Sequence, residues 1–268
     1  MHRNYLLALF TTAVVLLAVA PFDCTAAPKK EKRHTWVKDF EENFNRKHLN
    51  ENVWTYVKRA KTSALRYMSS NPECYEFTDS TIILKAIVND CDPSDTARYL
   101  TGGIYTRNLY EFTPGRFEIR ARMKTIQGGQ PAIWTGPFNH VPWPTGGEID
   151  IMEQYNHGKH IYQTVWSPYS YTLKIHDPKH QVKVPLDPEE FHIYGVDIME
   201  DRLVFHVDGV ETLVYPKIET DKEGQFPFYR SVYLFLDTQI IGKWGGPVNE
   251  DDLPEILEVD YVKHYRYK

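Results

Sequence analysis

The chain has 268 residues, of which 42% are hydrophobic and 25% are charged, so one domain can bury a full core. Its 31 Lys and Arg against 36 Asp and Glu leave no basic excess to neutralise a phosphate backbone, which argues against nucleic-acid binding. The 14% aromatic content, with 15 Gly and 17 Pro, argues against disordered and collagen-like classes.

The N-terminus has the order of a secretory signal peptide. A basic residue, Arg3, precedes an apolar run over residues 6–21, and small residues follow at 24–27. The run is shorter than the roughly 20 apolar residues of a membrane-spanning helix, so no membrane span is expected. We predict a signal peptide over residues 1–27 and therefore a secreted or periplasmic protein.

The segment after the predicted cleavage point is short and basic. We expect residues 28–35 to be a disordered N-terminus of the mature chain and residues 36–268 to form one folded domain. An uncleaved anchor stays open as an alternative, because basic residues at 29–33 lie just beyond the apolar run. Lipid attachment at Cys24 is disfavoured, since no small residue directly precedes it.

Two cysteines remain after cleavage, Cys74 and Cys91. An oxidising compartment permits them to pair. We predict a disulfide between them, with two free thiols as the alternative.

The domain itself is predicted to be all-β. Several segments have strand length and are rich in β-branched and aromatic residues: 81–88, 115–123, 191–198, 202–207 and 257–265. Residues 115–123 alternate strictly between apolar and polar, which indicates a strand with one buried and one solvated face. Asp208-Gly209 between two such segments is a hairpin signal. Short strands and regular turns favour a sandwich or barrel.

Three carboxylates lie within six residues: Glu148, Asp150 and Glu153. In a regular strand Glu153 would face away from Glu148, because side chains alternate with a period of two. One extra residue near 151–152, a β-bulge, places all three acids on one surface. Their side chains are then able to approach the ~5 Å separation of a retaining glycosidase pair.

Crowding separates the roles of these acids. Ionising all three together is costly, so their pKa values are driven apart. We expect one to remain ionised as a nucleophile, one to be protonated as an acid, and the middle one to hydrogen-bond the nucleophile. An acidic edge strand or a cation site stays open as an alternative, although the apolar residues between the acids indicate a strand whose other face is buried.

The run GGEIDIMEQYN resembles the active-site strand of glycoside hydrolase family 16, whose signature is Glu-x-Asp-x-x-Glu on a bulged strand. Further segments are similar to the family in order and spacing: residues 39–44 with Trp54, 102–104, 112–122, 131–134, 191–197 and 259–263. The resemblance covers residues 36–268. It implies a β-jelly-roll sandwich of two curved antiparallel sheets with a concave carbohydrate cleft. It also implies that Glu148 is the nucleophile, Asp150 the assisting acid and Glu153 the acid/base.

Aromatic and amide side chains complete the predicted cleft. Sugar rings stack on flat, amphipathic side chains, and Trp134, Trp143, Trp166 and Trp244 lie near Gly, Pro or polar residues. Each Trp taken singly is equally typical of a core residue. We predict that these four, with Gln163 and Gln239, bind substrate, although Gln163 and Trp166 cannot both face the sugar in a regular strand.

Substrate choice is the least determined feature. Family members that cut β-1,3-glucans typically have a Trp where this chain has Gln130, and a His where it has Trp166. The sequence near Trp166 and Gln239 resembles instead the gut-bacterial branch of endo-β-galactosidases. We therefore expect an endo-β-galactosidase acting on mucin O-glycans or poly-N-acetyllactosamine. A β-1,3- or mixed-linkage glucanase and an agar- or carrageenan-type galactanase remain alternatives.

Other chemistries are weakly supported. The 11 His have no zinc-ligand spacing, and neither a Gly-x-Ser-x-Gly elbow nor a phosphate loop is present. No cofactor is required, but Glu42 and Asp260 occupy places where some family members hold a structural calcium. We expect a monomer whose partner is an oligo- or polysaccharide or a glycoprotein glycan. A non-catalytic lectin on the same sandwich is the competing class, and the complete acid trio argues against it.

Overall fold

The computed structural model describes residues 35–242 and 245–268. The predicted signal peptide, almost all of the predicted basic N-terminus and Trp244 lie outside the described residues. In the part described, no helix is long and apolar enough to cross a membrane.

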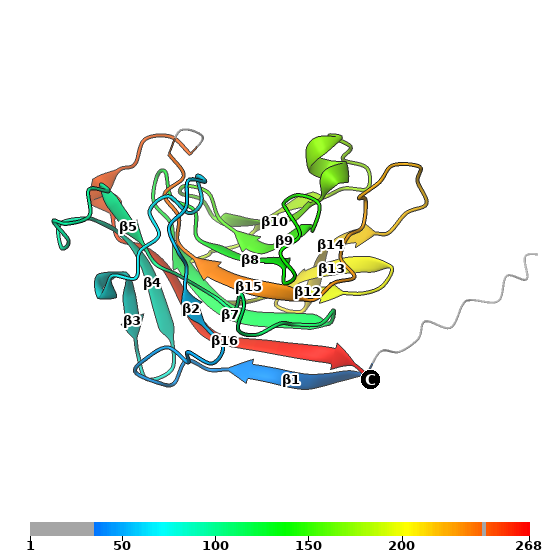
Figure 1. Cartoon of the computed structure of the whole chain (residues 1–268), viewed down its shortest axis with the longest axis horizontal. Coiled ribbons are helices and arrows are strands. Elements are labelled where there is room, and N and C mark those ends of the chain that lie inside the picture. The colour runs from blue at the N-terminus through cyan, green and yellow to red at the C-terminus, as the bar shows by residue number, and fades with distance from the viewer. Residues whose placement is uncertain (1–34, 243–244) are drawn as a thin grey trace, which may run out of the picture. The chain divides into compact units, whose positions relative to one another are not determined.

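Two antiparallel sheets form the domain, which confirms the all-β sandwich (Figure 1). The nine-stranded sheet runs in the order β14 (Val210–Pro216), β13 (Arg202–Val207), β12 (His192–Ile198), β7 (Arg116–Lys124), β16 (Glu255–Tyr267), β4 (Ile82–Val88) and β3 (Tyr75–Phe77), with β1 (Trp36–Glu42) on β16 and β5 (Tyr99–Thr101) on β4. The seven-stranded sheet runs β11 (Gln181–Pro185), β10 (His160–Trp166), β9 (Glu148–Glu153), β8 (Ala132–Pro137), β15 (Val232–Asp237), β6 (Gly103–Tyr105) and β2 (Thr55–Tyr56). Single helical turns occur at Pro72–Cys74, Pro168–Thr172 and Glu250–Asp252.

The sequence pattern explains these strands. On β7, Phe117, Ile119 and Ala121 are fully buried, while the charged residues between them are not. These apolar residues belong to one core cluster with Ile149 and Ile151 of β9, so the core lies between the two sheets. All five predicted segments are strands, with ends that differ by at most two residues.

The predicted hairpin joins β13 and β14. Asp208 and Gly209 both have positive φ, 51° and 77°, as a two-residue turn of this kind requires. Nearby on β12, the buried Asp197 accepts two hydrogen bonds of 2.6 Å from Arg116 on β7. This ion pair joins two strands of the nine-stranded sheet, on which none of the three predicted acids lies.

The predicted disulfide is wrong for this structure. Cys74 and Cys91 are both free thiols. Cys74 is fully buried in the core cluster, whereas Cys91 is exposed in the loop between β4 and β5. Burial raises the pKa of the Cys74 thiol to about 12, and the neighbouring Cys91 adds to this, so Cys74 is a protonated core side chain.

Candidate active site

The predicted bulge is present on β9. On its β8 side, Met152 pairs with Ile133 and Asp150 pairs with Trp134, so Ile151 has no partner. On its β10 side the register shifts at the same place, between Tyr162 and Thr164. One extra residue therefore lies in β9 between Asp150 and Glu153.

The bulge brings the three predicted acids to one cleft. Glu148, Asp150 and Glu153 all line a cavity of about 530 Å³. Asp150 is 3% exposed and Glu153 7% exposed, whereas Glu148 is half-buried. The intervening side chains of β9 point the other way and join the core cluster.

Each acid has its own hydrogen-bond partners. Glu153 has the best supported carboxylate, because Gln130 Nε2 donates to Oε1 at 2.5 Å and the Tyr155 hydroxyl donates to Oε2 at 2.8 Å. Asp150 shares a hydrogen bond with Glu153. The expected hydrogen bond from the middle acid to the nucleophile, Glu148, stays a prediction.

The electrostatics of the trio follow from burial and mutual repulsion. Burial, and next the charge of Glu153, raises the pKa of Glu148 to about 8. Burial also raises the pKa of Asp150 well above its usual range, and it raises that of Glu153 against the opposing hydrogen bonds from Tyr155 and Gln130. Glu148 and Asp150 are therefore mostly protonated at neutral pH. The proton of Asp150 makes the hydrogen bond to Glu153.

Three of the four predicted tryptophans line this cleft. Trp134 lies on β8 opposite Asp150 and stacks flat on Phe235, with ring centroids 3.9 Å apart. Trp143 is 48% exposed in the loop before β9, and its indole hydrogen-bonds Glu148. Trp166, opposite Glu148 on β10, hydrogen-bonds Asp150. These indoles combine flat apolar faces with N–H donors, which suits a sugar ring.

Gln163 does not reach the cleft. It is fully buried with the parity of Ile161 and Val165, which face the core, whereas Trp166 has the opposite parity. Its Nε2 donates to the carbonyl of Ile151 at 3.0 Å, and its Oε1 accepts from the Thr212 hydroxyl. Gln163 thus donates to a carbonyl of the bulge. Its polar side chain is explained by these two hydrogen bonds inside the protein and not by contact with substrate.

Gln239 and several unpredicted side chains complete the lining. Gln239 is 3% exposed and lines the cleft as predicted. Six further lining residues do not follow from the sequence pattern: Ser63, Ala64, Gln130, Tyr155, Tyr171 and Gln181. Gln130 stands out in the sequence only as a departure from the glucanase pattern. Gln130 lies two residues before β8, and β8 pairs with β9, which carries the three acids. This position next to β8 is the sequence signal that could have placed Gln130 in the cleft.

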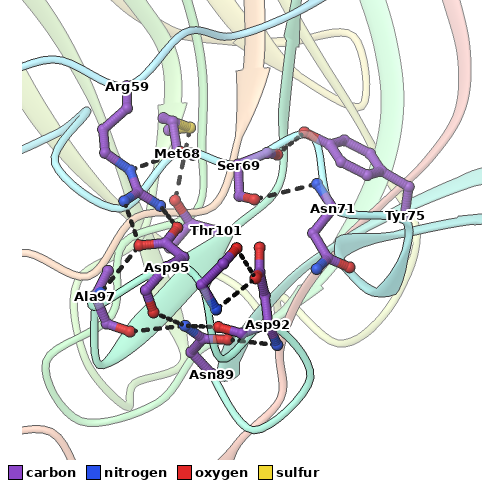
Figure 2. A network of polar contacts seen from close by, with 11 residues as sticks. Arg59, Met68, Ser69, Asn71, Tyr75, Asn89, Asp92, Asp95, Ala97 and Thr101 are labelled. Atoms are coloured by element: carbon purple, nitrogen blue, oxygen red, sulfur yellow. Dashed lines mark hydrogen bonds and ion pairs between the residues drawn. The ribbon is translucent and has the colours of Figure 1, made fainter.

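One part of the cleft lining comes from residues 57–68, which include Ser63 and Ala64. Arg59 holds this segment by donating to both carboxylate oxygens of Asp95, at 2.8 and 2.5 Å, and to the carbonyl of Met68 at 3.0 Å (Figure 2). Asn89 in turn ties the Asp95 loop together through its amide. The segment is therefore fixed to the loop between β4 and β5.

The two residues predicted to hold calcium have protein partners. Glu42 accepts the backbone N–H of Phe44 at 3.1 Å, and Asp260 pairs with Arg120. Among the residues described, no group of three or more His, Cys, Asp or Glu side chains is placed to hold a metal. Calcium binding stays a prediction.

Comparison with known proteins identifies one family. The family model of the glycosyl hydrolases family 16 matches residues 61–250. A keratan-sulfate endo-1,4-beta-galactosidase from Sphingobacterium multivorum is 27% identical over 216 residues, which are 80% of this chain and 51% of that protein. A beta-glucanase from Rhodothermus marinus is 30% identical over 187 residues, 66% of this chain and 65% of that protein. The chain thus spans about half of the first relative and less than two thirds of the second.

Solved structures agree on the fold. A laminarinase from Rhodothermus marinus superimposes with a TM-score of 0.77 at 24% identity, covering 88% of this chain and all of that one. A structure from work on endo-acting O-glycanases of the human gut microbiota that initiate mucin breakdown has a TM-score of 0.75 at 27% identity, covering 87% of this chain and all of that one. The relatives therefore include both galactose-cleaving and glucose-cleaving enzymes.

Proposed function

Because the chain belongs to the glycosyl hydrolases family 16, we propose that it is a secreted, retaining endo-β-glycosidase that cuts internal β-galactosidic bonds of mucin-type O-glycans or poly-N-acetyllactosamine. The observation that supports the activity most strongly is the bulge in β9, which gathers three acids in a cleft lined by tryptophans. The galactosidase and O-glycanase relatives support the substrate class.

The arrangement suits a double displacement. Ionised Glu148 attacks the anomeric carbon, while Glu153 gives its proton to the oxygen of the departing sugar, so that a glycosyl ester forms as the glycosidic bond breaks. Glu153, now a carboxylate, takes a proton from water, and the resulting attack on the ester releases the sugar with its β configuration and frees Glu148. The directions of the two pKa shifts make Asp150 the donor in its hydrogen bond to Glu153, so Asp150 carries the proton beside the acid/base and has to pass it to Glu153 before the first step.

Two cleft residues differ from those that a glucanase of this family typically has: Gln130 stands where that enzyme has a Trp, and Trp166 where it has a His. Gln130 contacts Glu153, and Trp166 closes the cleft beside Glu148 and Asp150. A site that reads a hydroxyl through a placed hydrogen bond discriminates more strongly than one that reads shape alone. Together with the galactosidase and O-glycanase relatives, these departures from the glucanase pattern favour galactose over glucose. Because laminarinases and a glucanase are also among the relatives, an endo-β-1,3(4)-glucanase is the second candidate.

The test is a substrate panel with product sizing. The protein is incubated with poly-N-acetyllactosamine, mucin O-glycans, keratan sulfate, laminarin and lichenan, and the products are resolved by length. We expect internal cleavage of the galactose-containing glycans and loss of all cleavage in Glu148→Gln, which is nearly isosteric. Laminarin as the best substrate would reject the galactosidase and leave the glycosidase intact. Binding to a glycan without any cleavage would favour a lectin.

A further inference from the structure

One more buried carboxylate lies beside the acid trio and has no part in the double displacement. Asp237 ends β15, the strand that pairs with β8 on one side and β6 on the other, and it is 0% exposed. It shares the parity of Phe235, which stacks on the cleft residue Trp134. Asp237 therefore faces the cleft side of the sheet and lies beneath the cleft lining.

Burial raises the pKa of Asp237 to about 8, and the hydrogen bonds from Gln239 and Trp134 oppose this rise. In its ionised form both carboxylate oxygens accept hydrogen bonds from these cleft side chains. Trp134 Nε1 donates to Oδ2 at 3.3 Å, and Gln239 Nε2 donates to Oδ1 at 3.0 Å. The indole N–H has no acceptor capacity, so Oδ2 must accept. One carboxylate thus fixes the plane of the tryptophan and the orientation of the amide together.

The rest of Gln239 is held as firmly. Its backbone N–H donates to the fully buried Glu255 at 3.3 Å, and its carbonyl accepts from the backbone of Gln130 at 2.9 Å. The Gln130 side chain in turn supports Glu153. Gln239 is therefore tied through one residue to the acid/base, and its amide has one orientation set by Asp237.

That orientation leaves one polar atom for the cleft. Since Gln239 Nε2 is used by Asp237, the amide presents Oε1, for which no protein donor is found within the described residues. An amide oxygen accepts a hydrogen bond and does not donate one. The partner that fits it is a sugar hydroxyl, placed beside the ring that stacks on Trp134.

We infer that Asp237 is the positioning residue for substrate recognition. It orients Gln239 so that the amide oxygen accepts a hydrogen bond from a hydroxyl of the sugar next to the cleaved bond. This rests on the proposed function for the identity of the glycan, although the orienting role itself applies to any sugar in the cleft. Galactose and glucose differ in the direction of the hydroxyl at carbon 4, so one fixed acceptor is able to separate them. Asp237 acts only through Gln239 and Trp134 and touches no reacting atom.

The structure provides a test by exchange of donors and acceptors. In Asp237→Asn, the single side-chain oxygen takes the place of the aspartate Oδ2 and accepts from Trp134, so Nδ2 faces Gln239 in place of Oδ1 and requires the amide to turn. The cleft then meets an NH2 group in place of the acceptor. We expect KM on the best glycan to rise roughly 10- to 100-fold, with a smaller change in kcat, because a sugar donor and an amide donor oppose each other.

Adding Gln239→Glu to Asp237→Asn restores the pattern. One oxygen of the new Glu accepts from the Asn amide and the other faces the cleft as an acceptor. We expect the double variant to recover most of the lost kcat/KM, whereas Gln239→Glu alone places two carboxylates together and loses activity. A residue needed only for folding would not be rescued in this way, so an unrescued double variant overturns the inference, as does an unchanged KM in Asp237→Asn.

Two controls complete the experiment. Asp197→Asn removes a buried carboxylate in the other sheet and is expected to lower Tm without changing KM. If Asp237→Asn does not fold, Gln239→Leu removes the amide and leaves Asp237 with Trp134, and an unchanged KM there overturns the inference equally. If laminarin is the best substrate, the proposed function fails. The wild type, Asp237→Asn, Gln239→Glu and the double variant are then compared on laminarin to judge Asp237 separately.

Discussion

The pH dependence of kcat/KM tests how the acid trio is charged. Only ionised Glu148 attacks, and burial with the charge of Glu153 raises its pKa to about 8 in the free enzyme. Since kcat/KM reports the free enzyme, it should rise roughly tenfold per pH unit up to about pH 8, with ~1% of the plateau value at pH 6. An aryl glycoside whose phenol departs without protonation isolates this step from the proton supplied by Glu153.

The substitution Glu153→Gln should shift the rising limb of this pH profile of kcat/KM in a known direction. The variant removes one negative charge beside Glu148 but leaves the burial, which is the larger cause, in place. The limb should move below pH 8 and stay above the ordinary value of 4.5. Asp187→Asn, an exposed acid paired with Lys159, should leave it unchanged. A limb that stays fixed or moves upward in Glu153→Gln would refute the coupling.

Two further predictions concern stability. Gln163→Leu removes the partner of the buried Ile151 carbonyl and of the half-buried Thr212 hydroxyl, so the free energy of unfolding should fall by about 2–4 kcal/mol. Thr212→Val keeps the bond to the Ile151 carbonyl, so in denaturant titrations it should lower the free energy of unfolding by less. Burial raises the pKa of Glu255 well above 4.5 in the folded protein. Its contribution to the free energy of unfolding is therefore complete below the pKa of the unfolded chain, near 4, and is lost as the pH rises through the pKa of the folded protein. The difference in Tm between Glu255→Gln and the wild type should therefore shift in favour of the variant as the pH rises from about 4. A difference in Tm that stays constant with pH would contradict this.

Strand positions and the acid site were predictable because they depend on local pattern. The alternation on β7 reflects one buried face, and the spacing of Glu148, Asp150 and Glu153 requires a bulge if all three acids are to share one face. The Asp-Gly turn likewise depends on two neighbouring residues.

What escaped prediction depends on contacts between distant strands. Gln163 is polar, yet it faces the core because a bulge on the neighbouring strand leaves a carbonyl to be satisfied. Asp237 is 89 positions from Glu148 along the chain (237 minus 148), and only sheet pairing through β8 brings the two near one another. A disulfide between Cys74 and Cys91 was predicted from their number and compartment alone, which do not reveal that one is a core residue and the other exposed.

The stereochemical outcome tests the central claim most directly. If Glu148 is a nucleophile paired with Glu153 across the bulge, the reaction proceeds through a glycosyl ester and retains configuration. Proton NMR of a digest, recorded before mutarotation, should show the new reducing end first as the β-anomer. An initial α-anomer would contradict this mechanism, because it requires water, and not Glu148, to attack the anomeric carbon.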